Sequence, residues 1–277
     1  MIQLGLIGYP LGHSLSPKIH GAAFKACELE GGYSLFPIHP DDRQGLIDLL
    51  ARVRFGEITG LNVTIPHKQN VIEFMDELTP TAQAIGAVNT ICMRENKLIG
   101  ENTDASGFLT DLKRVWTSSF IKQHSALILG AGGSARAVVY ALLHDGWDVT
   151  IAARRIEQAR QLANSFTSNQ LQIANISSYI IHHSSLIVNT TPLGMTPNIE
   201  ASPLPENITL LPHTIIYDLV YNPSETKLVK DARTQGCSAV TGLGMLIEQA
   251  ALAFEIWTGH TPPRDVLFDA VRATRPD

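Results

Sequence analysis

Residues 129–135 constrain the fold of this chain more than any other stretch. They read Leu-Gly-Ala-Gly-Gly-Ser-Ala, which gives the spacing G-x-G-x-x-A at Gly130, Gly132 and Ala135. An apolar run at 125–129 precedes the glycines, and an apolar-rich stretch follows them. The first glycine of such a motif permits a tight turn, the second admits a pyrophosphate, and the third small residue allows helix–strand packing. The motif predicts a dinucleotide-binding βαβ unit, with a purely structural turn as the alternative.

The end of the next predicted strand indicates which dinucleotide is bound. NAD-binding domains carry an acidic residue there, which holds the ribose 2′-hydroxyl. This chain has Ala153, Arg154 and Arg155 instead. A guanidinium pairs with a 2′-phosphate through two parallel hydrogen bonds and stacks on adenine. The pattern favours NADP over NAD, and two solvated arginines are the alternative.

Apolar runs alternate with helical patterns along the whole chain, which predicts α/β architecture with parallel sheets and helical crossovers. A domain boundary is predicted near Ser106 and a return near Leu243. The first domain then comprises 1–105 joined by C-terminal helices in 243–277, and the second, at 106–242, is a doubly wound Rossmann domain. Strands are expected at 4–8, 33–38, 58–66, 125–130, 147–154, 171–176, 185–191, 214–220 and 238–242. Helices are expected at 18–30, 41–53, 67–78, 106–116, 131–146, 155–166 and 242–259.

Composition excludes several classes of function. The chain has 277 residues and a formal net charge of −5, with no Lys/Arg-rich run, so nucleic acid is not expected as a partner. No apolar run reaches ~18 residues, so no membrane span is expected. The N-terminus lacks the features of a signal peptide. Three scattered cysteines fit a reduced cytoplasm, and no Cys/His spacing indicates a metal site.

The stretch Gly-His-Ser-Leu-Ser-Pro at 12–17 places two hydroxyls, Ser14 and Ser16, in a loop. A hydrolase nucleophile elbow needs glycine where Ser16 stands, so Ser14 is not marked as a nucleophile. One interpretation is a site for a hydroxylated or carboxylate ligand. The other is a turn and a helix cap, with the Ser16 hydroxyl before a proline at the first helical position.

A second group of polar residues stands where predicted strands end. Asn62, Thr64 and Lys68 follow one strand, and Asn89 and Asp104 lie further along the chain. Such side chains converge at the carboxyl edge of an α/β sheet, where ligands bind. Taken singly, each has an ordinary use in a turn, in a helix cap or on the surface.

Seven motifs together carry a resemblance to a known family. In chain order they are GHSLSPKIH, GLNVTIPHK, GAVNT, NTDASGF, LGAGGSARA, NTTPLGM and GLGMLIEQA. They resemble the shikimate dehydrogenase family over nearly the whole chain. The resemblance implies a substrate domain and an NADP domain with a cleft between them. It also implies reversible NADPH-dependent reduction of 3-dehydroshikimate to shikimate, in aromatic amino acid biosynthesis.

The resemblance also implies roles for individual residues. Lys68 would be the catalytic acid/base, paired with Asp104, and Ser14 and Ser16 would bind the substrate carboxylate. The other substrate-binding residues would be Asn62, Thr64, Asn89, Tyr221 and Gln249. The cofactor-binding residues would be Gly130, Ala131, Gly132, Gly133, Ser134, Ala153, Arg154, Arg155, Leu219 and Gly242.

One stretch departs from the family pattern. The family usually has Asn-Arg-Thr where this chain has Ala153, Arg154 and Arg155, so the arginine is kept and two hydrogen-bonding side chains are lost. A dehydrogenase of the same superfamily that uses quinate is the nearest rival. Such relatives often carry Thr at the position of Ser16, so Ser16 and the missing acid after the second strand of the cofactor domain favour shikimate and NADP. A binding module without the chemistry should have lost Lys68 or Asp104. The expected partner is a small-molecule substrate, and the expected state is a monomer or homodimer.

Overall fold

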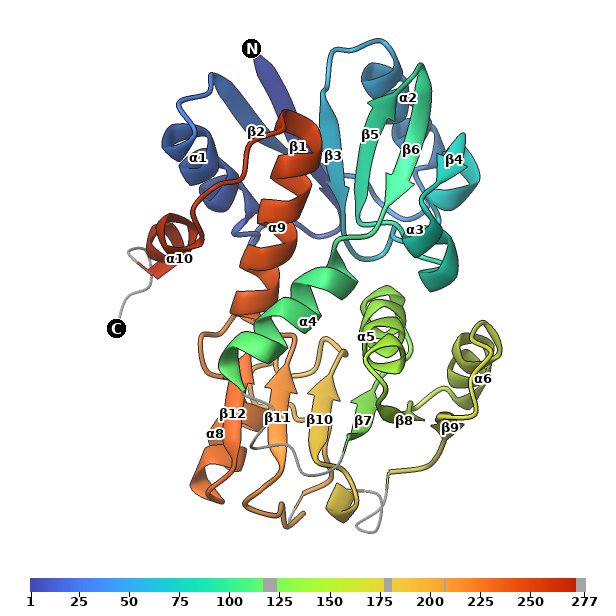
Figure 1. Ribbon diagram of the computed structural model, residues 1–277, viewed down its shortest axis with the longest axis vertical. Coiled ribbons are helices and arrows are strands. Elements are labelled where there is room, and N and C mark those ends of the chain that lie inside the picture. The colour runs from blue at the N-terminus through green and yellow to red at the C-terminus, as the bar shows by residue number, and fades with distance from the viewer. Residues whose placement is uncertain (117–123, 177–180, 207, 273–277) are drawn as a thin grey trace. The chain divides into compact units, whose positions relative to one another are not determined.

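The computed structural model describes residues 1–116, 124–176, 181–206 and 208–272. Its contacts divide the chain into two units. Unit 1 comprises Met1–Gly107 with Leu246–Asp277, and unit 2 comprises Phe108–Met245. The last five residues of the predicted first domain lie outside the described part of the chain. Both units are α/β, as the alternation of apolar runs predicts (Figure 1).

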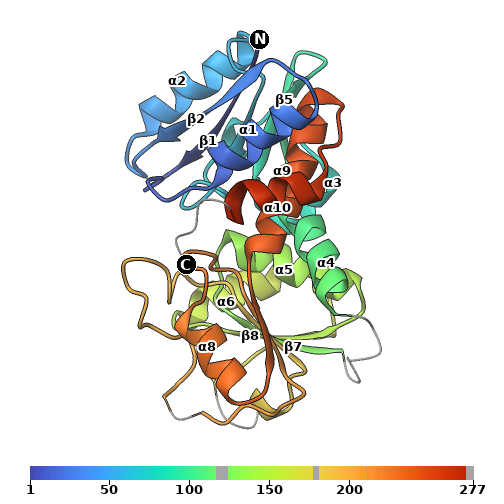
Figure 2. The same cartoon turned by 90° about the vertical axis from the view of Figure 1, so that its left-hand side faces the viewer.

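Unit 1 is built on a six-stranded sheet of order β2-β1-β3-β5-β6-β4. Its strands are β1 (Ile2–Gly8), β2 (Gly31–Pro37), β3 (Gly60–Val63), β4 (Glu77–Leu78), β5 (Thr90–Arg94) and β6 (Lys97–Glu101). Its helices are α1 (Ser16–Ala26), α2 (Arg43–Arg54), α3 (Pro80–Ile85), α10 (Arg264–Arg272) and most of α9 (Leu243–Thr258). Figure 2 shows α1, α9 and α10 on one face of this sheet and α2 on the other.

The prediction of parallel sheets is wrong for part of unit 1. β5 pairs antiparallel with both β3 and β6, whereas β1 pairs parallel with β2 and β3. A two-residue turn at Glu95 and Asn96, both with positive φ, joins β5 to β6. Two positive φ values in a two-residue turn are typical of a hairpin, which reverses the chain and forces antiparallel pairing.

The helix predicted at 67–78 is also wrong. Residues 65–71 form turns, a single 3₁₀ turn covers Ile72–Phe74, and β4 follows. The apolar spacing there serves packing: Val71 is fully buried in the core, and Ile72 and Met75 pack against it. Thr79 follows this segment and caps the start of α3, where its hydroxyl accepts a hydrogen bond from the Ala82 N–H.

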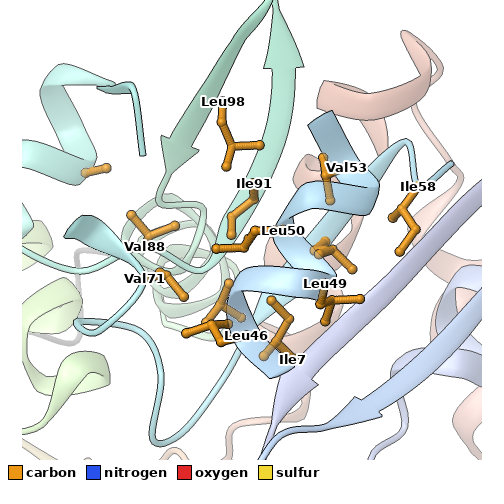
Figure 3. Packing of buried hydrophobic residues seen from close by; sticks show 13 residues of the cluster. Ile7, Leu46, Leu49, Leu50, Val53, Ile58, Val71, Val88, Ile91 and Leu98 are labelled. Carbon is orange, nitrogen blue, oxygen red and sulfur yellow. The ribbon is translucent and has the colours of Figure 1, made fainter. Parts of the chain in front are cut away.

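A hydrophobic core lies between α2 and the sheet of unit 1. Leu46, Leu49, Leu50 and Val53 recur along α2 at helical spacing and are buried against the sheet. Figure 3 shows these side chains packed against residues of neighbouring elements, namely Ile7, Ile58, Val71, Val88, Ile91 and Leu98. Burying a side chain of this size contributes roughly 1.5–3 kcal/mol, so this cluster fixes where the strands end.

Unit 2 has a parallel six-stranded sheet of order β12-β11-β10-β7-β8-β9, the doubly wound order of a Rossmann fold (Figure 1). Its strands are β7 (Ser125–Leu129), β8 (Asp148–Ala152), β9 (Leu171–Ile173), β10 (Leu186–Asn189), β11 (Ile215–Asp218) and β12 (Ser238–Thr241). Its helices include α5 (Gly133–His144), α6 (Ile156–Asn164), α8 (Lys227–Thr234) and most of α4 (Asp104–Val115). The sequence analysis did not predict α8.

Candidate active site

A buried ion pair lies at the carboxyl edge of the unit 1 sheet. Lys68 Nζ donates to Asp104 Oδ2 at 2.5 Å, and the two residues are 8% and 4% exposed. The Val88 N–H donates to the Lys68 carbonyl at 2.7 Å, which fixes the turn that carries the lysine. Asp104 begins α4, where the Asn102 Oδ1 accepts from its N–H at 3.0 Å. A buried pair keeps both charges only because each has such partners.

Asn89 connects this pair to two other elements. Its Nδ2 donates to Asp104 Oδ1 at 2.8 Å, and Gln249 Oε1 of α9 lies 3.3 Å from the same nitrogen. Its Oδ1 accepts from the Thr103 N–H at 2.8 Å. The amide therefore orients the carboxylate of Asp104, and both oxygens of that carboxylate have a donor.

Asn62 supports the same network from β3. Its Nδ2 donates to the Asn89 carbonyl at 3.2 Å, and its Oδ1 accepts from the Tyr33 hydroxyl at 2.8 Å. Tyr33 in turn stacks on His20, with ring centroids 4.2 Å apart. Neither residue was predicted to support the site: Tyr33 lies inside an ordinary strand pattern, and His20 ends the motif GHSLSPKIH without a role assigned to it.

The loop that carries Ser14 and Ser16 differs from the expectation at the start of α1. The structure corrects the predicted cap, because Ser16 is the first residue of α1 and Leu15 occupies the cap position without a side-chain hydrogen bond. Instead, Ser14 Oγ accepts from the Ser16 N–H at 3.2 Å. Thr64 packs closely on Gly8, where an added Cβ would lie 2.3 Å from the threonine methyl group.

A cavity of about 320 Å³ opens beside the glycine loop in unit 2. Its described lining residues are Leu129, Gly130, Ala152, Ala153, Arg154, Ala174, Asn175, Ile176, Thr191, Leu193 and Pro203. Arg154 of the predicted cofactor set lines it, and Arg155 does not: it stands at the cap position of α6. Asn175, Thr191 and Leu193 were not predicted as cofactor residues: Thr191 and Leu193 belong to the motif NTTPLGM, to which no residue role was assigned, and Asn175 follows a strand without a motif.

The glycine loop and the segment near Gly242 each require glycine. Gly130 has a φ of 113°, and an added Cβ would lie 2.6 Å from the Thr190 hydroxyl. A Cβ at Gly132 meets nothing within 4 Å, so this position is open to a ligand. At Gly242 a Cβ would lie 2.4 Å from the Leu219 carbonyl, which places two predicted cofactor residues side by side.

Comparison with known proteins decides the family. Family models match residues 6–91 as "shikimate dehydrogenase substrate binding domain", 114–201 as "shikimate / quinate 5-dehydrogenase" and 242–272 as "shikimate 5′-dehydrogenase C-terminal domain". A shikimate dehydrogenase (NADP⁺) of Salinibacter ruber is 40% identical over 97% of this chain and 96% of its own. The chain belongs to the shikimate dehydrogenase family.

Solved members of the shikimate dehydrogenase family share the fold. The Thermus thermophilus enzyme, in complex with NADP(H) and shikimate, matches 99% of both chains with a TM-score of 0.88 at 36% identity. A quinate dehydrogenase of Corynebacterium glutamicum in complex with NAD also matches with a TM-score of 0.88, at 31% identity over 98% of this chain and 99% of that one. The likeness therefore spans enzymes that differ in substrate and cofactor.

The cavity of unit 2 fits the dinucleotide that shikimate dehydrogenases of the NADP⁺ type use. No acidic side chain stands among its described lining residues, and Arg154 offers a guanidinium at its wall. The N-terminus of α5 follows Gly132, and first-turn N–H groups favour phosphate. No set of three or more His, Cys, Asp or Glu in the described ranges is grouped to hold a metal. The helices within those ranges include none long and apolar enough to span a bilayer.

Proposed function

We propose that this member of the family catalyses the reversible NADP-dependent interconversion of 3-dehydroshikimate and shikimate. NADP, when bound, supplies the hydride acceptor and NADPH the hydride donor. The observation that carries the proposal is the buried pair of Lys68 and Asp104 at 2.5 Å, in a network that also includes Asn62, Asn89 and Gln249.

Lys68 acts as the acid and base of the reaction. When a ketone is reduced, negative charge develops on its oxygen, and an ammonium group stabilises that charge and delivers a proton. In the oxidation direction the same nitrogen takes the proton from the hydroxyl. Asp104 orients Lys68 and accepts from a substrate hydroxyl. Asn89 donates to the Asp104 carboxylate and holds it in an orientation in which it can both orient Lys68 and accept from the substrate hydroxyl.

The substrate carboxylate is assigned to the two serines. Ser16 lies at the start of α1, where first-turn N–H groups and the helix dipole favour an anion, and its hydroxyl takes part in no hydrogen bond among the described residues. Thr64 and Gln249 complete the hydroxyl-binding set. Tyr221, where burial raises the pKa of the phenol, is assigned to the same set and donates rather than ionises.

The cofactor is assigned to unit 2. Residues Gly130 to Ser134 hold the pyrophosphate, and Arg154 pairs with the 2′-phosphate. Arg155, at the N-terminus of α6, adds positive charge beside it. The cofactor set is completed by Ala153, Leu219 and Gly242. This cofactor, with three free cysteines and no zinc spacing, supports a reduced cytoplasmic location. The oligomeric state, monomer or homodimer, stays a prediction that light scattering can decide.

The proposal is tested with the purified chain by following NADPH absorbance with shikimate and NADP. The wild type is expected to turn over. Lys68→Met is expected to lose roughly 10²–10⁴-fold in kcat, while shikimate binding measured by calorimetry stays within a few-fold. The matched control is Lys97→Met, which removes an exposed lysine paired with Glu77 and leaves kcat unchanged. A Lys68→Met variant with a kcat within a few-fold of the wild-type value would refute the assignment of Lys68 as the acid and base.

A further inference from the structure

The C-terminal ends of β10 and β11 hold a buried carboxylate that the proposed reaction does not use. Asp218, the last residue of β11, is fully buried and has three hydrogen-bond donors. The Asn189 Nδ2 and the Val220 N–H donate to its Oδ1 at 2.8 and 3.0 Å. The Thr226 hydroxyl donates to its Oδ2 at 2.6 Å. Burial raises the pKa of Asp218 to about 6, against the opposite effect of these donors.

Asn189 connects Asp218 to the loop at 190–195 by hydrogen bonds. Its Oδ1 accepts from both the N–H and the hydroxyl of Thr191, at 2.9 and 2.7 Å. Its Nδ2 also donates to the Leu193 carbonyl at 3.2 Å. One amide thus holds the loop by three hydrogen bonds while its nitrogen is held by Asp218. The orientation of the amide is set by the carboxylate, which can only accept.

The loop held in this way forms one wall of the cofactor cavity. Thr191 and Leu193 line the cavity together with Gly130 and Arg154. Thr190 also donates from its hydroxyl to the Leu129 carbonyl at 2.7 Å, beside the glycine turn. A loop that is already ordered before binding loses less freedom when the ligand arrives, so its anchors raise affinity without touching the ligand.

We propose that Asp218 is a positioning residue for NADP, which acts through Asn189 to hold the loop at 190–195 in its binding conformation. The inference rests on the proposed binding of NADP in this cavity. Asp218 is fully buried and is not among the described residues that line the cavity, so its role is to position the loop rather than to contact NADP. Its effect falls on cofactor affinity and on the mobility of the loop.

The experiment compares Asp218→Ala and Asn189→Ala with the wild type. The dissociation constant of NADP is measured by fluorescence titration, and hydrogen exchange is followed in the peptide that spans 190–196. Both variants are expected to weaken NADP about tenfold, the loss of roughly one charge-assisted hydrogen bond, and to speed exchange in that peptide. The Michaelis constant for shikimate is expected to stay within about twofold. Asp218→Asn, which keeps an acceptor facing Asn189, is expected to restore most of the affinity.

Asp111→Ala is the matched control. Asp111 is also a buried carboxylate of unit 2, hydrogen-bonded to Tyr217 and Arg114 rather than to the loop. Asp111→Ala should lower the free energy of unfolding without changing the affinity for NADP. The inference is overturned if Asp218→Ala binds NADP like the wild type, or if Asp111→Ala weakens NADP equally. If Asp218→Ala does not fold, Asn189→Ala decides alone. A wild type that binds no NADP would refute the proposed function itself.

Discussion

His20 makes the stability of unit 1 depend on pH in a way that one substitution removes. Its ring is 1% exposed and stacks on Tyr33, with Phe254 and Trp257 nearby. Among the described residues neither ring nitrogen has a hydrogen-bond partner of acceptable geometry. Burial lowers the pKa of His20 from 6.5 to about 3. The nearby Asn62 side chain acts in the opposite direction and raises this pKa, but its effect is smaller. The folded protein therefore excludes a proton that the unfolded chain binds.

The size and sign of the effect follow from this shift. Between pH 6.5 and about pH 3 the unfolded state binds more protons than the folded state, so stability falls as the pH falls. From about pH 7.5 to about pH 5 the unfolded His20 becomes almost fully protonated, which costs the folded state about 2 kcal/mol. His20→Phe keeps a ring on Tyr33 and cannot titrate. Between about pH 7.5 and about pH 5, the free energy of unfolding of His20→Phe is expected to fall by about 2 kcal/mol less than that of the wild type.

Urea titrations followed by circular dichroism at the two pH values measure this difference. The other nine histidines cancel in the comparison, since both proteins contain them. His260→Gln is the control, because His260 is exposed and its replacement removes no buried ring. Its loss of stability on acidification should equal that of the wild type. Equal losses for His20→Phe and the wild type would refute the reasoning.

Three further substitutions test the assigned binding roles. Ser16→Ala should raise the Michaelis constant for shikimate about tenfold with little change in kcat, and unchanged steady-state kinetics would return the serine to a structural role. Arg154→Ala should raise the Michaelis constant for NADP by about tenfold or more and leave that for NAD nearly unchanged; a parallel rise for both cofactors would remove Arg154 from the 2′-phosphate. Gly242→Ala should lower the melting temperature, because its Cβ would lie 2.4 Å from the Leu219 carbonyl; a melting temperature like that of the wild type would show that the backbone relaxes at no cost.

The glycine loop was predictable because backbone chemistry fixes its residue types. Gly130 adopts a positive φ beside Thr190, where an added Cβ would lie too close, so glycine is required there, and Gly132 keeps the space before α5 open. The flanking strand and helix follow from apolar periodicity. The order of strands in unit 2 is the one expected for a doubly wound dinucleotide-binding domain, which the glycine motif between a strand and a helix predicts.

Other features could not be predicted because they depend on distant contacts. Residues 67–78 carry a helical apolar spacing, yet Val71 and its neighbours use it to pack an irregular segment on the core. The hydrogen bond of Tyr33 to Asn62 joins residues 29 positions apart; the position of Asn62 at a strand end was visible in the sequence, but its partner Tyr33 was not. Asp218 lies inside the predicted strand 214–220, and its three hydrogen-bond donors come from residues whose positions the local pattern does not give.

The central claim is tested most directly by initial rates with shikimate or quinate, each crossed with NADP or NAD. The network around Lys68 and Asp104, with Ser16 at the helix start and Arg154 at the cofactor cavity, predicts a strong rate only with shikimate and NADP. Comparable rates with quinate or with NAD would contradict the specificity assigned to Ser16 and Arg154. No rate with any of the four pairs would contradict the proposed function.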